Sequence, residues 1–311
     1  MIALCYNHQR YLKQALTSVL EQTYSEIELI IVDDASTDSS VVEIEDFISQ
    51  NSNNKIIRQV KILFLKENQG NCKAFNLAFE QSKGQYIIDL ATDDVLHKDR
   101  ISKQIACFEK LESTYGVIFT NAFLINEEGE KIGTHYSKSK KNIPSGDIYQ
   151  NLISAGGLIA APTMLIRRDV LEKLGGYDED LSYEDYNFWV RSSRIYDYFY
   201  LDETLTYKRK VNNSHGSQFY KSKNNEHLTS TLKICRKALK LNQSQTENLA
   251  LAKSIRYHLK LSLFTANFDL IFKYFELLKY CKSITYKDLF FKRIASWRIN
   301  LYPLYRWYRS F

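Results

Sequence analysis

The first half of the chain alternates short apolar runs with amphipathic stretches, and this alternation limits the fold more than any other feature. The apolar runs predict strands at 2–5, 28–32, 60–65, 85–90 and 116–121. Apolar residues at helical spacing predict helices at 11–22, 41–49, 72–81 and 98–111. Strands that are joined by crossover helices pair in parallel, and helices cover both faces of such a sheet. The sequence therefore predicts an α/β fold with a mainly parallel sheet between two layers of helices.

The pattern changes after residue 121. A turn signal at 126–129 lies inside an apolar stretch, which predicts a hairpin over 123–132. The next expected elements are a basic loop, a strand, a short helix that ends at Gly175 and Gly176, and a further helix, at 138–144, 163–168, 169–174 and 184–196. From about residue 220 onward the pattern is helical throughout.

Charge divides the chain near the same point. Residues 1–215 contain 24 Lys and Arg against 31 Asp and Glu, whereas residues 216–311 contain 18 against 5. The first part is therefore net acidic and the second strongly basic. We predict two regions, an α/β domain over 1–215 and a basic, aromatic-rich helical region over 216–311.

Composition narrows the class of protein. A chain of 311 residues with 44% hydrophobic content can bury a sizeable core. Its five cysteines are widely spaced and never form a Cys-x-x-Cys pair, which argues against a disulfide framework and a zinc site and favours a reducing compartment. No apolar run approaches the ~18 residues of a spanning helix, and no leader pattern opens the chain. We expect a cytoplasmic protein.

Two aspartate pairs follow predicted strands directly. Asp33 and Asp34 come after 29–32, and Asp93 and Asp94 come after 86–90. The carboxyl ends of parallel strands form the ligand crevice of an open α/β sheet, so four carboxylates there suggest a site for a cation, a sugar or a base. Either pair alone could instead cap the following helix. A phosphoacceptor receiver domain also gathers acids at strand ends, but its chain is far shorter and its acids do not follow the fourth strand.

A set of segments extends this clue. Segments 5–7, 11–24 and 28–38 are followed by Asn68-Gln69-Gly70-Asn71, by the strand exit Thr92-Asp93-Asp94, by Gly175-Gly176-Tyr177-Asp178-Glu179, by Glu184-Asp185 and by Phe188-Trp189-Val190-Arg191. In this order, over about residues 1–215, they resemble the signature of family 2 glycosyltransferases, which are inverting enzymes with the Rossmann-like GT-A fold. The resemblance implies that residues 1–215 form a catalytic domain that binds a nucleotide sugar.

The resemblance also implies roles for individual residues. Asp34 would hold the nucleotide base, where a carboxylate that accepts from the imide N–H of uracil would favour UDP. Asp33 would lie against the ribose or structural hydroxyls. Asp94, with Asp93 alongside, would hold Mn²⁺ or Mg²⁺ on the diphosphate and offset the charge of the leaving group. The predicted nucleotide-binding residues are Tyr6, Asn7, Asp33, Asp34, Asn68 and Asp93, and the predicted metal ligand is Asp94.

One position departs from the family pattern. The fuller metal motif has an acidic residue two positions before the aspartate pair, and this chain has Ala91 there. Some family members with a non-acidic residue at this position are metal-dependent. We interpret Ala91 as a change that weakens ribose or metal contacts without abolishing them.

Inversion requires a general base that takes the proton of the acceptor hydroxyl. The resemblance points to Asp185 as this base and to Glu184 as a residue that orients the acceptor. The alternative is that both acids only stabilise the first turn of a helix, where the helix dipole favours negative charge. The basic run Lys208-Arg209-Lys210 is interpreted as an exposed face rather than a phosphate clamp.

The end of the chain is not explained by the catalytic signature. Residues 282–311 contain seven Lys or Arg, one acidic residue and nine aromatic residues. Such a segment suits an anionic membrane interface. It could equally pack within the protein or against a second subunit, and from the sequence both interpretations stay open. Nucleic acid is not an expected partner, because the acidic first part would repel phosphates.

Together these observations predict an inverting glycosyltransferase. It would move a sugar from a nucleotide-diphosphate sugar, UDP being the expected nucleotide, to a hydroxyl of a bacterial surface glycan or its lipid-linked precursor. It would work in the cytoplasm, and a peripheral position at the inner face of the plasma membrane stays open with the role of residues 282–311. The alternative is a catalytically silent protein of the same fold that binds sugar nucleotides or acts as a scaffold.

Overall fold

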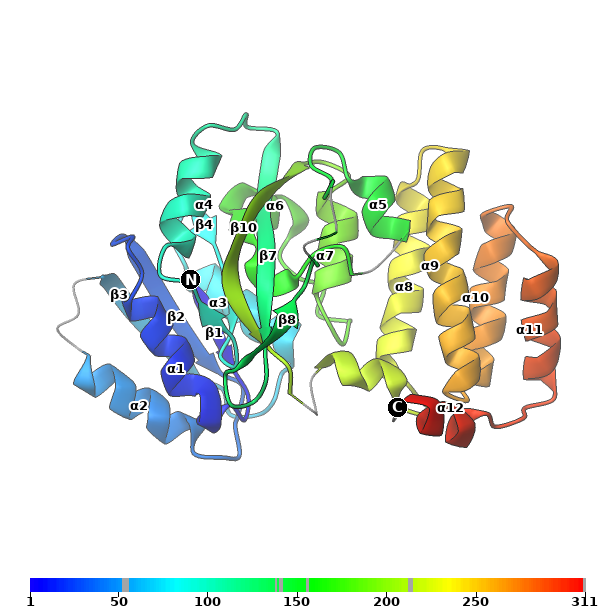
Figure 1. Ribbon diagram of the computed structural model, residues 1–311, viewed down its shortest axis with the longest axis horizontal. Helices are drawn as coiled ribbons and strands as arrows, with labels where there is room; N and C mark the ends of the chain where they lie inside the picture. Colours follow the sequence, from blue (N-terminus) through cyan, green and yellow to red (C-terminus); the bar gives the residue numbers. More distant parts are fainter. Residues whose placement is uncertain (52–55, 138, 140–141, 155–156, 212–214, 310–311) are drawn as a thin grey trace. The chain divides into compact units, whose positions relative to one another are not determined.

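The computed structural model in Figure 1 describes residues 1–51, 56–137, 139, 142–154, 157–211 and 215–309. The chain forms two compact units that exchange segments along the sequence. The first unit comprises Met1–Ile148, Ile159–Glu179 and Ile195–Val211. The second comprises Tyr149–Leu158, Asp180–Arg194 and Asn212–Phe311.

A four-stranded parallel sheet forms the centre of the first unit. Its strands are β1 (Ile2–Cys5), β2 (Ile27–Asp33), β3 (Ile57–Phe64) and β5 (Asp89–Ala91), in the order β3-β2-β1-β5. In the register of the sheet, Cys5 pairs with Asp33, and Asp33 pairs with Phe64. The strands therefore end at one edge, and the predicted fold class, α/β with a parallel sheet, is confirmed.

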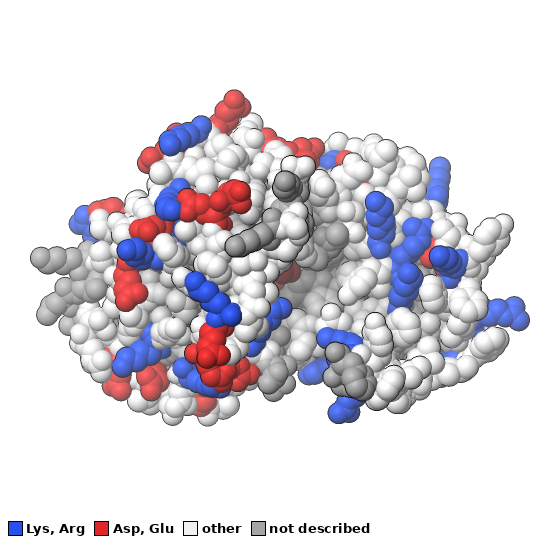
Figure 2. Space-filling view, in the orientation of Figure 1, with Lys and Arg blue, Asp and Glu red and all other residues white. Residues whose placement is uncertain are grey.

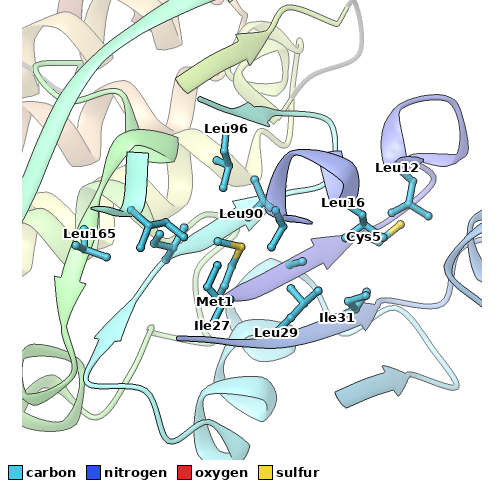
Figure 3. Packing of buried hydrophobic residues seen from close by; sticks show 14 of the residues in the cluster. Met1, Cys5, Leu12, Leu16, Ile27, Leu29, Ile31, Leu90, Leu96 and Leu165 are labelled. Atoms are coloured by element: carbon cyan, nitrogen blue, oxygen red, sulfur yellow. The ribbon is translucent and has the colours of Figure 1, made fainter. Parts of the chain in front are cut away.

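Helices cover this sheet because its strands are apolar on both faces. Ala3, Cys5, Leu29 and Ile31 alternate with residues of the opposite face and pack under α1 (Gln9–Leu20) and α2 (Ser40–Gln50). Figure 3 shows side chains of α1, β1 and β2 meeting in this layer. On the other face, α3 (Asn71–Gln81) contacts β1 and β2. The buried layers fix where the strand ends lie.

A second sheet contains the remaining strands. Its order is β4 (Tyr86–Ile87), β9 (Leu165–Arg167), β7 (Tyr115–Ile125), β10 (Asp197–Arg209) and β6 (Val95–Leu96), with β8 (Lys131–Thr134) paired to β7. Only β7 and β10 pair in parallel among these described strands. The sequence had suggested that the strand at 116–121 joins the parallel sheet, but this strand belongs to the second sheet. An apolar run fits either sheet, so periodicity alone could not assign it.

Other boundaries were predicted with mixed success. The hairpin around 126–129 is confirmed, with β7 and β8 antiparallel on either side of the turn. The strand predicted at 85–90 is divided between the two sheets, as β4 and β5. The helix predicted at 184–196 is shorter, at Asp185–Ser192, and the sequence analysis missed the long strand β10 that follows it. Residues 138, 140 and 141 of the predicted basic loop lie outside the described residues.

The remaining helices of the first unit are short. They are α4 (Arg100–Phe108), α6 (Arg168–Leu174) and the 3₁₀ turn η1 (Ala161–Thr163). α6 ends as predicted at Gly175, whose φ of 70° is left-handed.

The second unit is helical, as predicted from residue 220 onward. It contains α5 (Tyr149–Ser154), α7 (Asp185–Ser192), the 3₁₀ turn η2 (His215–Tyr220), α8 (Glu226–Leu241), α9 (Gln245–Phe264), α10 (Phe268–Tyr280), α11 (Tyr286–Ser296) and α12 (Tyr302–Arg309). Because α5 and α7 pack on α8 and α9, the units do not follow the predicted division at residue 215. No helix in the described part of the chain is both long and apolar enough to cross a membrane.

Candidate active site

The carboxyl edge of the parallel sheet gathers the polar ends of three adjacent strands. The backbone N–H of Asp34, after β2, donates to the carbonyl of Cys5 (2.9 Å). The N–H of Thr92, after β5, donates to the carbonyl of Leu4 (3.0 Å). We call the acidic segments after β2 (33–34) and after β5 (93–94) the first and the second exit. Both exits continue the hydrogen bonding of β1, which lies between them. Nδ1 of His8 lies 2.9 Å from Oγ1 of Thr92 and ties the loop after β1 to the second exit.

The loops after β1 and β2 hold one another through side chains. Asp33 is buried and accepts from the N–H and the hydroxyl of Ser36 (2.9 and 2.5 Å). Oδ1 of Asn7 accepts from the N–H of Thr37 (2.7 Å), and the N–H of Asn7 donates to Oγ of Ser36 (2.9 Å). These bonds give Asp33 and Asn7 a structural role at the predicted site. Tyr6, at the end of β1, is 45% exposed and available to a ligand.

Asp34 is buried, and its carboxylate binds backbone of another segment. Its two oxygens accept the N–H groups of Gln69 (2.7 Å) and Gly70 (2.9 Å), just before α3 begins. Gly70 has a φ of 81°, a conformation that favours glycine and turns this N–H towards the carboxylate. Asp34 therefore fixes the 68–70 segment, in which Asn68 itself is exposed.

A hollow of about 500 Å³ lies beside this segment. It is lined by the end of the β3 loop and the first turns of α3, namely Leu65, Lys66, Glu67, Gln69, Lys73 and Leu77. The volume lies within the range of small-molecule sites. Because Gln69 belongs both to the hollow and to the Asp34 hydrogen bonds, the two features form one region.

The second exit has different surroundings. Asp94 is 3% exposed, and one of its oxygens accepts the N–H of Arg209 (2.8 Å). No described group donates to its other oxygen, and the half-buried Asp93 side chain accepts no hydrogen bond from a described residue. Burial, together with the charge of Asp93, raises the pKa of Asp94 to about 8.

Arg209 was wrongly predicted to be part of an exposed face. It is 4% exposed, and its Nε donates to the carbonyl of Asp93 (2.9 Å). Its other nitrogens donate to the carbonyl of Asn126 (2.9 Å) and to Oε1 of Gln14 (2.6 Å), and its guanidinium lies over the ring of Tyr11. Arg209 therefore joins β10, the hairpin and α1 around the second exit. Apolar and polar residues alternate before Arg209, and this pattern could have indicated the strand that places Arg209 in the interior.

A second buried cation lies near Asp94. Arg100 is fully buried and donates from Nη2 to the carbonyl of Met164 (2.9 Å). Its Nη1 is buried without a hydrogen-bond partner among the described residues. Burial lowers the pKa of Arg100 to about 9, and the Asp94 carboxylate opposes this shift. No local pattern indicated Arg100, because its burial depends on packing against a residue 64 positions away.

The carboxylates of the second exit can be compared with the ligands that a divalent ion requires. Among the described residues no three His, Cys, Asp or Glu side chains come together as a metal site. Mg²⁺, however, is commonly held by one or two carboxylates together with substrate phosphates. Asp94 and Asp93 provide hard oxygen donors with unused capacity, and burial keeps the pKa of Asp94 raised although Lys208 and Arg100 act to lower it. The residues fit an ion that shares its coordination with a phosphate.

The Gly175-Gly176-Tyr177 segment is fixed by α3. Asn76 exchanges hydrogen bonds with the backbone N–H and carbonyl of Tyr177 (both 2.9 Å). A Cβ at Gly176 would approach Oδ1 of Asn76 to 2.5 Å, so this close contact requires glycine. The Tyr177 ring stacks on Phe75 with centroids 4.1 Å apart. The matched segments around 76 and 177 are thus parts of one packed structure.

Glu184 and Asp185 belong to the second unit. Glu184 is the N-cap residue of α7, and Asp185 is its first residue. Both side chains are half-buried, and the Asp185 carboxylate accepts the N–H of Tyr186. This is the position where a helix dipole favours an ionised carboxylate.

Comparison with known proteins identifies the family. The family described as "Glycosyl transferase family 2" matches residues 1–175. The chain belongs to this family, and the predicted resemblance is confirmed. An uncharacterized glycosyltransferase of Rickettsia typhi is 30% identical over 210 residues, which cover 66% of this chain and 61% of the relative. The chain thus spans about three fifths of that relative's length.

Two further proteins extend the comparison. The Bacillus subtilis protein named "Putative teichuronic acid biosynthesis glycosyltransferase TuaG" is 27% identical over 223 residues, which cover 71% of this chain and 82% of TuaG. The crystal structure of residues 1–349 of S. aureus TarS, in complex with UDP-GlcNAc, has a TM-score of 0.67 at 19% identity and covers 98% of this chain and 90% of the TarS chain. The likeness to TarS shows a shared fold, which is the predicted GT-A fold.

Proposed function

We propose that this family 2 glycosyltransferase transfers a sugar from a UDP-sugar to an acceptor hydroxyl with inversion at the anomeric carbon. The observation that carries the proposal is the pairing of two different acidic exits at one edge of the parallel sheet. Asp34 lies beside a hollow of about 500 Å³, and Asp94 has an oxygen that no described group uses. A base site and a diphosphate site are what a nucleotide-sugar enzyme requires at such an edge.

The first exit would recognise the nucleotide. The Asp34 carboxylate accepts two backbone N–H groups, and a carboxylate has about four acceptor positions. It retains capacity for the imide N–H of uracil, while the exposed Tyr6 and Asn68 would contact the base or ribose. The structure of TarS with UDP-GlcNAc supports uracil as the base. Asn7 and Asp33 would act by holding the loops that surround the nucleotide.

The second exit would hold the diphosphate. Asp94, with Asp93 alongside, would bind Mn²⁺ or Mg²⁺, which supplies positive charge for the leaving nucleoside diphosphate. Ala91 removes a third carboxylate from this strand end. We therefore expect weaker metal binding than in relatives with an acid at this position. Arg209 donates from its side chain to the backbone carbonyl of Asp93 and from its backbone N–H to the carboxylate of Asp94.

The general base in this proposal is Asp185. The acceptor oxygen would attack the anomeric carbon as the bond from that carbon to the diphosphate oxygen breaks, and Asp185 would take the hydroxyl proton. Asp185 is the first residue of α7, where a helix dipole favours negative charge, and the ionised carboxylate is the form that accepts a proton. Glu184, one residue earlier, would orient the acceptor.

The acceptor that we propose is a bacterial surface glycan or its lipid-linked precursor. The assigned name of TuaG refers to teichuronic acid biosynthesis, which is a cell-envelope polysaccharide pathway, and supports this class of acceptor. Enzymes that use nucleotide sugars on such acceptors work where both substrates meet. We place this chain at the cytoplasmic face of the plasma membrane.

A thermal-shift panel tests the donor site without knowledge of the acceptor. The full chain is heated with UDP-, GDP- and ADP-sugars, each with Mn²⁺ or with a chelator. A UDP-sugar at a hundred times its Kd should stabilise the chain by about 2.7 kcal/mol. The stabilisation should shrink on chelation, and Asp94→Ala should remove the metal-dependent part.

A second arm separates binding from catalysis. Asp185→Asn should keep the nucleotide stabilisation and lose transfer, which is followed as release of UDP. Wild-type transfer by Asp185→Asn would remove this residue from the mechanism. Strong UDP-sugar binding by a wild-type chain that releases no UDP with any glycan acceptor would favour the catalytically silent alternative.

A further inference from the structure

The last two helices of the second unit present an aromatic surface that the glycosyl transfer reaction does not use. On α11, the exposed side chains Tyr286, Leu289, Phe290, Arg293 and Trp297 follow one another at helical spacing. Their exposed fractions reach 91% at Tyr286 and about 60% at Phe290 and Trp297. These five side chains form one stripe along the outer side of the helix, which we call the α11 stripe.

The opposite side of α11 is fixed to the unit. Asp288 is 1% exposed and accepts the N–H of Thr285 (2.8 Å) and the Nε–H of Arg256 of α9, which its two oxygens share (3.0 and 3.2 Å). Ala295 on the same side is fully buried. α11 cannot rotate its stripe inward without breaking a buried ion pair, which typically costs several kcal/mol.

α12 repeats this arrangement in a shorter form. Its inner side is held by Tyr305, which stacks on Phe264 with centroids 5.3 Å apart, and by Arg309, whose guanidinium lies 3.4 Å from the ring centre of Tyr220. Its outer side carries large exposed side chains at i, i+3 and i+4, namely Leu304, Trp307 and Tyr308. Exposed apolar side chains that gather in this way commonly mark an interaction surface.

Only basic side chains surround these stripes within 282–309. The single acid of that segment, Asp288, is buried in the ion pair with Arg256. Five exposed cations make no ion pair with any described residue: Lys282, Lys287, Arg293, Arg306 and Arg309. Arg298 does pair with Asp269, but both side chains are well exposed, and such pairs contribute little. Figure 2 likewise shows Lys and Arg, and few Asp or Glu, on the visible side of this unit.

We propose that the α11 stripe and the exposed side of α12 bind an anionic lipid bilayer. Trp and Tyr prefer the headgroup level of a bilayer, because their rings are apolar and their polar atoms reach water. Leu289, Phe290 and Leu304 gain from burial among acyl chains, and the unpaired cations gain from lipid phosphates. The surface would bring the unit to the membrane in a peripheral mode. This inference does not depend on the donor or on the transfer reaction.

Two other partners could cover this surface, a second copy of the chain or a nucleic acid, and charge favours lipid over both. In a two-fold dimer the same patch faces itself, so the unpaired cations of one copy would meet those of the other. Nucleic acid would satisfy the cations but would leave Leu289 and Leu304 in contact with water or phosphate. The net acidic first part of the chain, with 31 Asp and Glu against 24 Lys and Arg in residues 1–215, also repels a polyanion of great length.

Vesicle flotation of the full chain tests the proposal. The vesicles contain phosphatidylcholine alone or phosphatidylcholine with phosphatidylglycerol, and the measured quantity is the partition coefficient. The wild-type chain should float with the anionic vesicles only. The double variant Lys287→Gln and Arg293→Gln should partition about 30-fold less, because each cation near an anionic surface contributes about 1 kcal/mol. Phe290→Ser with Trp297→Ser should reduce partitioning roughly tenfold.

A matched control lies in the first unit. Val42 and Lys13 are exposed on α2 and α1, so Val42→Ser with Lys13→Gln removes the same kinds of group from another surface and should leave partitioning unchanged. Light scattering and RNA gel shift are run on the same samples, and circular dichroism checks the fold. Equal partitioning of variants and wild type would overturn the proposal. So would a loss of self-association or of RNA binding without a change in flotation.

Discussion

The two acidic exits of the parallel sheet look alike in sequence and differ in chemistry. After β2, Asp34 has an oxygen on each of two backbone N–H groups, and its neighbour Asp33 is bonded to Ser36. After β5, Asp94 is equally buried, but only one of its oxygens receives a hydrogen bond from a described residue. At the first exit each oxygen of the buried carboxylate accepts a backbone N–H, whereas at the second exit one oxygen accepts none from a described residue.

This difference predicts different roles for the two carboxylates: Asp34 supports the surrounding loops, whereas Asp94 can bind an added cation. A carboxylate whose two oxygens both accept backbone N–H groups fixes the loops around it, and removing it should release those loops. A buried carboxylate with a pKa raised to about 8 is held at a cost to stability, which an added cation could relieve. The comparison therefore predicts that equivalent substitutions at the two exits act on different properties of the chain.

The largest contrast should appear in activity. Asp94→Asn removes the negative charge but keeps an oxygen that can accept the Arg209 N–H. We expect transfer to fall roughly 10²–10³-fold, as when one electrostatic group is lost from a preorganised site. The free energy of unfolding should stay equal or rise, because Asn cannot ionise at a site where burial disfavours the ionised carboxylate. UDP release and urea denaturation measure the two effects.

Asp202→Asn is the control for this variant. Asp202 is an exposed carboxylate of β10 and accepts only the hydroxyl of Tyr200 among the described groups. It should leave both transfer and stability near wild type. If Asp94→Asn were as active as this control, the second exit would have no electrostatic role, and the comparison between the exits would fail.

The next contrast should appear in stability. In Asp34→Asn one carboxylate oxygen becomes an NH₂ group, which faces the N–H of Gln69 or of Gly70 and cannot accept from it. A buried donor that loses its acceptor costs about 1–3 kcal/mol. Urea denaturation should therefore show a less stable variant. The exposed Asp46→Asn on α2 is the matched control, and equal stability of the two variants would show that Asp34 does not hold the 68–70 segment.

The sequence predicted the parallel sheet because its signals are local. Leu29, Ile31 and the apolar residues of α1 alternate with the periods of a strand and a helix, and those periods depend only on neighbouring residues. Once the strands are parallel, their carboxyl ends share an edge. The convergence of the 33–34 and 93–94 exits on either side of β1 follows from that rule.

The rest depends on contacts between distant segments. Arg209 reads as one member of a basic run, and its burial follows only from the pairing of β10 with β7 and β6. Arg100 is buried against Met164, and Asn76 against Tyr177, at sequence separations that no local pattern reports. The hydrogen bonds from Gln69 and Gly70 to Asp34 also join segments that are distant in the sequence. Sequence reasoning could find the acids but not the groups that distinguish them.

The smallest predicted effect concerns another acid of the first exit, Asp38. Burial raises its pKa, but hydrogen bonds from Ser40 and from the N–H of Gln9 outweigh burial, and the folded pKa is lowered. A carboxylate with a lowered folded pKa adds stability above its unfolded value of 3.8, and that stability is lost as pH falls through the folded value. Because Asp38 is exposed, we expect less than about 1 kcal/mol.

Urea denaturation at pH 6 and at pH 3 can resolve this contribution. Asp38→Asn should be slightly less stable than wild type at pH 6, and the difference should shrink towards zero at pH 3, where the wild-type carboxyl group takes up its proton. Glu45→Gln on α2 is the control, since the exposed Glu45 accepts no hydrogen bond from a described residue. A gap between Asp38→Asn and wild type that widened at low pH would mean that Asp38 is not held ionised. The first exit would then resemble the second, where the shift of the Asp94 pKa has the opposite sign and stability should grow as pH falls below about 8.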